Sequence, residues 1–266
     1  MEKTLRLPLS IALAVLAAPA FAGEPYTPVP LAPAETLTPP ADLIADATAL
    51  LKAAQLGDLN GLAAGLAPTV TVLDGAIELA VPRHREKLGP YGTTEELLAQ
   101  LSNFIGGDLP LANDGSDETR VRLEGERQFI VESLTDGRPW GTDPELEGAV
   151  CTYAYRTYDR EALKALSEAL ETMSSSFVYV DSPYQLLASP ERGAATVATL
   201  EPDRLYALDY ETDAPIGWMA VHMPQGGSGF AEFELAQLDK PYVSGLCFRK
   251  NEAGRWVVVA QASTSL

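Results

Sequence analysis

The residues most suggestive of chemistry lie in the stretch "GWMAVHMPQGGSGFAE", Gly217 to Glu232. A Gly-Gly-Ser-Gly run near His222 could bind a phosphate, because the N–H groups of a glycine-rich loop cradle anions when a helix follows. Here the strand pattern "GFAEFE" follows, and no lysine lies between the loop and Lys240. The stretch therefore predicts a β-hairpin with a glycine-rich turn.

The only two cysteines, Cys151 and Cys247, could form a nucleophile, a zinc site or a disulfide. A nucleophilic cysteine needs a nearby histidine and usually a helix start, whereas Cys151 lies in the strand-like run "AVCTYAYRTY". The only histidines, His84 and His222, lack the close-pair spacing of zinc ligands. In an oxidising compartment the even count predicts the disulfide Cys151–Cys247, with two buried free thiols as the alternative.

The acidic residues do not single out a catalytic pair. The run "NDGSDE", residues 113–118, offers oxygen ligands but lacks the spacing of a calcium-binding loop. Glu78 stands between two apolar residues, yet on a half-exposed strand its side chain would face water. No serine lies in a Gly-x-Ser-x-Gly elbow. We therefore predict no catalytic residue, no metal site and no cofactor.

Several aromatic residues of the C-terminal third could line a groove for peptide or glycan, although a small β domain also needs aromatics in its core. We expect Trp218 and Phe230 in that core. Tyr184 and Tyr210 lie near loop ends and are the candidates for a ligand-binding surface. His222 shares a strand face with Trp218 and is the third candidate, with a half-buried supporting role as the alternative.

Residues 1–22 have the layout of a secretory signal peptide, with Lys3 and Arg6 before an apolar core and a cut expected after Ala22. Removing them leaves 17 basic and 36 acidic residues, a net charge of −19. Such a surface repels nucleic acid and anionic membranes. We expect a periplasmic or secreted protein with no nucleic-acid partner and no membrane span after cleavage.

The pattern along the mature chain predicts the elements that position these residues. Residues 23–41 contain six prolines and predict an extended, poorly ordered linker. Residues 42–174 mix helical and strand periodicity and predict an α+β domain, in which residues 119–134 have strand character. Residues 177–266 carry short strand-like runs separated by turn residues and predict a small all-β barrel.

The pieces "LLASPERGAATVATLEPDRLYAL" and "GWMAVHMPQGGSGFAE" resemble a bacterial SH3-like domain, which would extend from about Phe177 to the end. The matching positions are Pro190, Leu200, Gly217, Trp218, Val221, Gly229, Phe230 and Ala231. In the first loop "LLASP" stands where many members place an arginine or asparagine. The stretch "ADATALLKAAQLGDLNGLAAGLAPTVTVLDG" is similar to the opening of SnoaL-like α+β domains, which implies a pocket between helices and a curved sheet.

The SH3-like resemblance implies binding to the cell envelope or wall. We therefore expect an exported, non-catalytic binding or scaffolding protein of the bacterial envelope, whose partner is wall peptide or glycan or an envelope protein. The alternative is an envelope enzyme or small-molecule-binding protein. Its pocket would lie in the N-terminal α+β domain and converge on Glu78, His84 or Tyr153.

Overall fold

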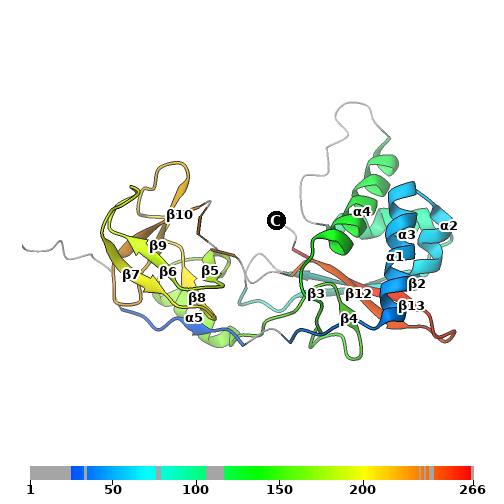
Figure 1. The fold of residues 1–266 in the computed structure, drawn as a ribbon, viewed down its shortest axis with the longest axis horizontal. Coiled ribbons are helices and arrows are strands. Elements are labelled where there is room, and N and C mark those ends of the chain that lie inside the picture. The colour runs from blue at the N-terminus through cyan, green and yellow to red at the C-terminus, as the bar shows by residue number, and fades with distance from the viewer. Residues whose placement is uncertain are drawn as a thin grey trace, which may run out of the picture.

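The structure, a computed structural model, describes residues 25–32, 35–75, 79–105, 117–233, 235–236, 238–239 and 243–264. Helices and three sheets make up two lobes, so the chain is an α+β protein (Figure 1). The predicted signal peptide, residues 1–22, lies outside the described residues.

The first lobe holds a five-stranded sheet with the strand order β3-β2-β13-β12-β4. β13 runs parallel to β2, and the other neighbours are antiparallel. Four helices pack on the sheet around a core that includes Leu50, Leu98, Ile130 and Val72. The elements are α1 (Ala41–Leu56), α2 (Leu59–Gly65), β2 (Leu66–Gly75), β3 (His84–Leu88), α3 (Thr94–Leu101), η1 (Ser102–Phe104), α4 (Glu118–Thr135), β4 (Val150–Cys151), β12 (Gly245–Lys250) and β13 (Trp256–Thr264).

Short-range hydrogen bonds set the starts of the first helices. The Asp58 side chain accepts the N–H of Asn60 at the start of α2. Thr93 and Glu96 form a reciprocal capping box at the start of α3, so two otherwise unpaired backbone N–H groups are satisfied. These contacts explain why both helix starts are readable from the sequence.

The prediction of strand character for residues 119–134 is wrong, because the structure forms helix α4 there. The buried residues of α4 are Glu126, Ile130 and Ser133, which recur at helical intervals of four and three. A charged residue in this buried stripe hides the helical period from a hydrophobicity count.

The second lobe contains two open sheets, with the orders β1-β8-β5-β11 and β7-β6-β10-β9. Among its described strands no closed barrel forms, in contrast to the barrel expected for residues 177–266. Its elements are β1 (Val29–Pro30), α5 (Arg160–Ala169), η2 (Ser174–Ser176), β5 (Phe177–Val180), β6 (Tyr184–Leu187), β7 (Thr196–Leu200), β8 (Arg204–Ala207), β9 (Trp218–His222), β10 (Ser228–Glu232) and β11 (Leu238–Asp239).

The glycine-rich stretch forms the predicted hairpin between β9 and β10. Gly226 and Gly227 have φ angles of 100° and 73°, a backbone region that glycine adopts without strain. The expectation that Trp218 and Phe230 fill the core is wrong, because both stay partly exposed. Strand alternation turns Val221 into the core and therefore turns Trp218 to the other face.

The last two strands pair in the first lobe. The sequence pattern groups residues 245–264 with the other strands of residues 177–266, but in the structure β13 pairs with β2 and β12 pairs with β4. β13 is buried on both faces, as expected for a central strand rather than a strand of a small half-exposed sheet. Apart from β1, the second lobe is therefore inserted in the chain between β4 and β12.

The proline-rich segment is extended, as predicted, but it is not a loose linker. Val29 pairs with Leu205 of β8, Leu31 forms a bridge with Tyr158, and both Val29 and Leu31 are buried. Farther along, the N–H of Leu37 donates to a carbonyl of the first lobe at 2.8 Å. This segment, drawn in blue in Figure 1, runs from the second lobe to the start of α1. Backbone pairing on both lobes is what orders it.

Candidate functional site

A cleft of about 310 Å³ opens in the second lobe beside the loop that joins β8 to β9. Tyr210 and Trp218 supply its aromatic side chains, and Asp213 supplies an exposed carboxylate. The Tyr210 side chain is 67% exposed, which is unusual for so large an apolar ring. The cleft therefore combines a stacking surface with negative charge.

Asp209 holds the loop that forms this cleft. Its side chain is buried and accepts the N–H groups of Glu211 and Thr212 at 2.9 and 3.0 Å. The Ser228 hydroxyl, from the neighbouring strand β10, also donates to it. Burial favours the neutral acid, but these hydrogen bonds outweigh it and hold the Asp209 pKa below its ordinary value. Asp209 therefore orders the site, and its lone pairs are largely used within the protein.

His222 supports the cleft from behind rather than lining it. Its Nε2 lies 3.9 Å from the Asp209 carboxylate, and its side chain is about a quarter exposed. Its carbonyl accepts the Tyr26 hydroxyl at 2.8 Å, which ties the N-terminal segment to this edge of the lobe. Burial of Tyr26 raises the pKa of that hydroxyl, so it stays a donor.

The two candidate tyrosines have different positions. Tyr210 lines the cleft, whereas Tyr184 lies on β6, where its hydroxyl oxygen accepts the N–H of Glu232 at 3.2 Å. The hydroxyl of Tyr184 thus stabilises the sheet by bonding the backbone of β10, and its half-buried ring packs against the core of the second lobe. Of the three predicted ligand-binding residues, only Tyr210 reaches the cleft.

No protein-family model, curated protein or solved structure matches this chain. Among the described helices, none is long and apolar enough to cross a membrane. Within the same part of the chain, no three side chains of His, Cys, Asp or Glu are placed to hold a metal ion.

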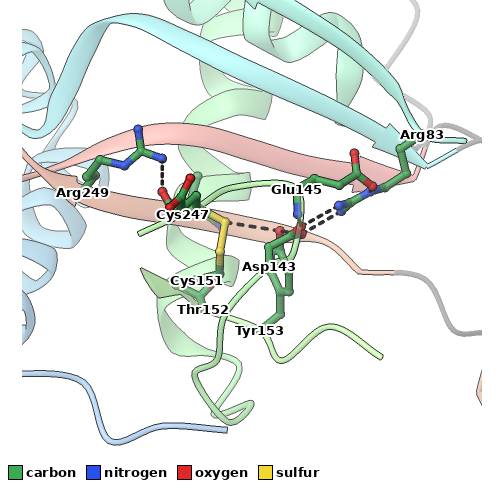
Figure 2. The surroundings of a disulfide bond; sticks show 10 residues. Arg83, Asp143, Glu145, Cys151, Thr152, Tyr153, Cys247 and Arg249 are labelled. Atoms are coloured by element: carbon green, nitrogen blue, oxygen red, sulfur yellow. Dashed lines mark hydrogen bonds and ion pairs between the residues drawn. A yellow bond between two sulfur atoms is a disulfide. The ribbon is translucent and has the colours of Figure 1, made fainter. Parts of the chain in front are cut away.

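The five-stranded sheet of the first lobe contains the predicted disulfide. Cys151 of β4 lies directly opposite Cys247 of β12, and their sulfur atoms are bonded at 2.04 Å (Figure 2). Both residues are fully buried. Because the second lobe is inserted between these two strands, the disulfide closes the base of the insertion.

A buried ion pair lies next to the disulfide. Arg83 donates to both carboxylate oxygens of Asp143 at 2.9 and 2.7 Å, and Tyr153 donates to the same carboxylate at 2.7 Å (Figure 2). Burial alone would lower the pKa of Arg83, but the hydrogen bonds and charge of Asp143 hold it above its ordinary value. Burial, and then the Asp143 charge, raises the pKa of Tyr153. Arg83, Asp143 and Tyr153 thus bond one another, so the network fixes the fold beside the disulfide.

Replacing Tyr153 by phenylalanine is expected to lower the free energy of unfolding by about 1.5–3 kcal/mol, because a buried carboxylate loses one of its donors. Urea unfolding monitored by circular dichroism measures the change. Tyr155→Phe is the matched control, because the Tyr155 ring lies 4.6 Å from the Arg83 guanidinium and phenylalanine retains that contact. Equal losses in both variants would contradict a role for the Tyr153 hydroxyl.

A second unusual group lies inside the first lobe, where sequence reasoning found none. Glu126 of α4 is 1% exposed, and its closest polar partner is Gln261 of β13, with Nε2 3.5 Å from the carboxylate. Burial raises the Glu126 pKa to about 8, although the Gln261 hydrogen bond opposes the shift. The Gln261 Oε1 and Ser263 Oγ atoms are buried and have no hydrogen-bond partner among the described residues. Near neutral pH, Glu126 is therefore mainly a protonated acid in a polar interior.

The pocket expected around Glu78, His84 or Tyr153 does not come together from the described residues. The His84 side chain is 62% exposed on β3 beside Glu86, whereas Tyr153 is buried against Asp143. Glu78 lies outside the described residues. The signal that could have revealed Glu126 instead is its spacing of four residues from Ile130 on α4.

Proposed function

We propose that this chain is an exported, non-catalytic binding or scaffolding protein of the bacterial envelope, and that its second lobe is an SH3-like recognition module. The sequence of residues 1–22 supports export, and the SH3-like resemblance supports a role at the wall. The proposed partner class is wall peptide or glycan, or an envelope protein.

The observation that carries this proposal is the position of Tyr210. Its ring is exposed at a cleft, while buried Asp209 accepts two backbone N–H groups and a hydroxyl and so fixes the loop that presents it. A rigid exposed aromatic beside a hollow is typical of the few residues that dominate binding energy at interfaces. The fully paired networks elsewhere, such as Arg83 with Asp143, contribute stability instead.

Tyr210→Ala is expected to weaken retention of the mature protein on purified wall material by about tenfold or more, since aromatic anchors contribute at least this much to binding. A co-sedimentation titration measures the apparent affinity. Met173→Ala is the control, because that side chain is similarly exposed, at 60%, but does not line the cleft. Absence of retention of the wild-type protein would refute wall binding. Equal retention of all three proteins would show that the cleft does not contribute to wall binding.

Glu126 favours a second candidate function, a small-molecule site or an enzyme in the first lobe. A protonated carboxylic acid beside Gln261, whose Oε1 has no partner among the described residues, could hydrogen-bond a neutral polar ligand or donate a proton to it. Melting temperatures measured with a panel of small neutral amides and sugars test this function. Stabilisation of the wild-type protein but not of Glu126→Gln would support it, and no shift with either would count against it.

A further inference from the structure

Large apolar side chains project from the second lobe next to the cleft. We call Tyr210, Ile216, Trp218, Phe233 and Leu235 the apolar patch. Ile216 is fully exposed, and Tyr210, Phe233 and Leu235 are each more than 60% exposed. Exposed hydrophobic residues scattered singly over a surface are ordinary, but a contiguous group marks an interaction site.

Backbone contacts bring the members of the patch together. The N–H of Phe233 donates to the Gly217 carbonyl at 2.8 Å, which places Phe233 beside the turn that carries Ile216. Trp218 pairs across the strands with Glu232, the residue before Phe233. Tyr210 and Trp218 line the same cleft. The patch therefore continues the cleft across the turn before β9 and the end of β10.

Residues 205–239 bring mainly negative charge to this region, although Glu232 is paired with Arg192 from the loop between β6 and β7. Residues 205–239 contain no lysine or arginine, and their six acidic residues are Asp209, Glu211, Asp213, Glu232, Glu234 and Asp239. Asp213 lines the cleft itself, and Glu211 is exposed on the same loop. The carboxylates of Glu211 and Asp213 therefore favour a partner that brings positive charge to this edge of the cleft.

We propose that the apolar patch docks a basic, amphipathic segment of another protein, with aliphatic side chains on the patch and Lys or Arg beside Glu211 and Asp213. This inference rests on the proposed binding function and names its partner. A glycan would leave the exposed aliphatic side chains of Ile216 and Leu235 without apolar contacts, because its hydroxyl groups prefer polar neighbours. An acidic partner would meet both the local carboxylates and the net charge of −19.

Fluorescence anisotropy with three labelled synthetic peptides of 14 residues each tests the proposal on the mature protein. The first peptide contains leucine and lysine at helical amphipathic spacing, the second replaces lysine with glutamate, and the third replaces leucine with serine. We expect saturable binding of the leucine–lysine peptide alone, weakened as salt concentration rises because charge contributes. Ile216→Ser and Phe233→Ser should each weaken that binding about tenfold.

Matched variants separate the patch from general attraction to an acidic protein. Leu56→Ser changes a side chain that is 71% exposed on the first lobe, and it should leave peptide affinity unchanged. Asp213→Asn should weaken binding and reduce its salt dependence, whereas Glu252→Gln, an exposed acid after β12, should not. Far-UV circular dichroism and melting temperatures check that each variant is folded.

The outcomes distinguish this inference from the function on which it rests. Wall material bound through Tyr210 without saturable binding of the leucine–lysine peptide would overturn the basic-segment partner and leave the envelope-binding function standing. Loss of both wall binding and peptide binding would overturn both the envelope-binding function and the basic-segment partner. Equal binding of the glutamate peptide, or full affinity in Ile216→Ser and Phe233→Ser, would overturn the docking surface.

Discussion

Glu126→Gln is expected to raise the free energy of unfolding at pH 9 by up to about 5 kcal/mol relative to the wild-type protein. The ordinary pKa of glutamic acid is near 4.5, and burial raises that of Glu126 to about 8. The folded state therefore retains a proton that the unfolded state has released. Charging this carboxyl in the interior costs free energy, and glutamine never becomes charged.

The sign of the pH dependence follows from the two pKa values. The contribution of the retained proton is fully present below about pH 4.5 and is lost as the pH rises through about 8. Over that window wild-type stability should fall by up to about 1.4 kcal/mol per pH unit from this group. Below pH 4.5 the two proteins should have nearly equal stability, because both then carry a neutral side chain.

Urea unfolding at a series of pH values from 4.5 to 9 measures this difference. Glu132→Gln is the matched control, because Glu132 is exposed on the same helix and should leave the wild-type pH dependence in place. The same slope in Glu126→Gln and the wild-type protein would show that Glu126 does not titrate in this range.

Local hydrogen bonds account for the elements that the sequence predicts well. Asp58, Thr93 and Asp159 each accept a backbone N–H within three residues, so their helix starts are readable without knowledge of the rest of the chain. The turn of the β9–β10 hairpin is equally local, because Gly226 and Gly227 adopt the positive φ angles that it requires.

Long-range strand pairing accounts for the main differences between the fold predicted from the sequence and the observed fold. Strand periodicity marks β13 as a strand, but nothing in its residues says that its neighbour is β2, almost two hundred positions earlier. The N-terminal segment behaves similarly, because its order comes from pairing with β8 and not from its own composition. A sequence pattern measures local preference, and these contacts are decided by the tertiary fold.

The residues of the candidate sites likewise differ in whether local sequence or tertiary contacts determine their positions. A position near a loop end predicts both Tyr210, which lines the cleft, and Tyr184, whose hydroxyl instead accepts a backbone N–H on the sheet. Glu126 escapes sequence reasoning because residues 119–134 are predicted as a strand, which hides the buried stripe of α4, and because glutamate is normally exposed. Its burial depends on Gln261, which reaches it from the far end of the chain.

Removing the disulfide by Cys151→Ala with Cys247→Ala is expected to lower the free energy of unfolding by about 4–5 kcal/mol in the chain-entropy account, because the bond closes a loop of 96 residues. Both cysteines are replaced, since a single change would leave a free thiol. Alanine fills less space than cystine, and the resulting cavity adds to the loss.

The position of the bond makes its loss larger than that of an ordinary surface link. β4 has only two residues in register with β12, so the disulfide and the hydrogen bonds between Thr152 and Leu246 together join the two ends of the inserted lobe. Tyr153 follows two residues after Cys151, and its hydroxyl lies 3.2 Å from the Cys247 sulfur, so loosening β4 also disturbs the donors of Asp143. Urea unfolding with and without reductant measures the effect, and reductant should change the wild-type protein but not the double variant. Two free thiols in a non-reducing mass measurement of the purified wild-type protein, or equal stability of both proteins, would contradict the role assigned to this bond.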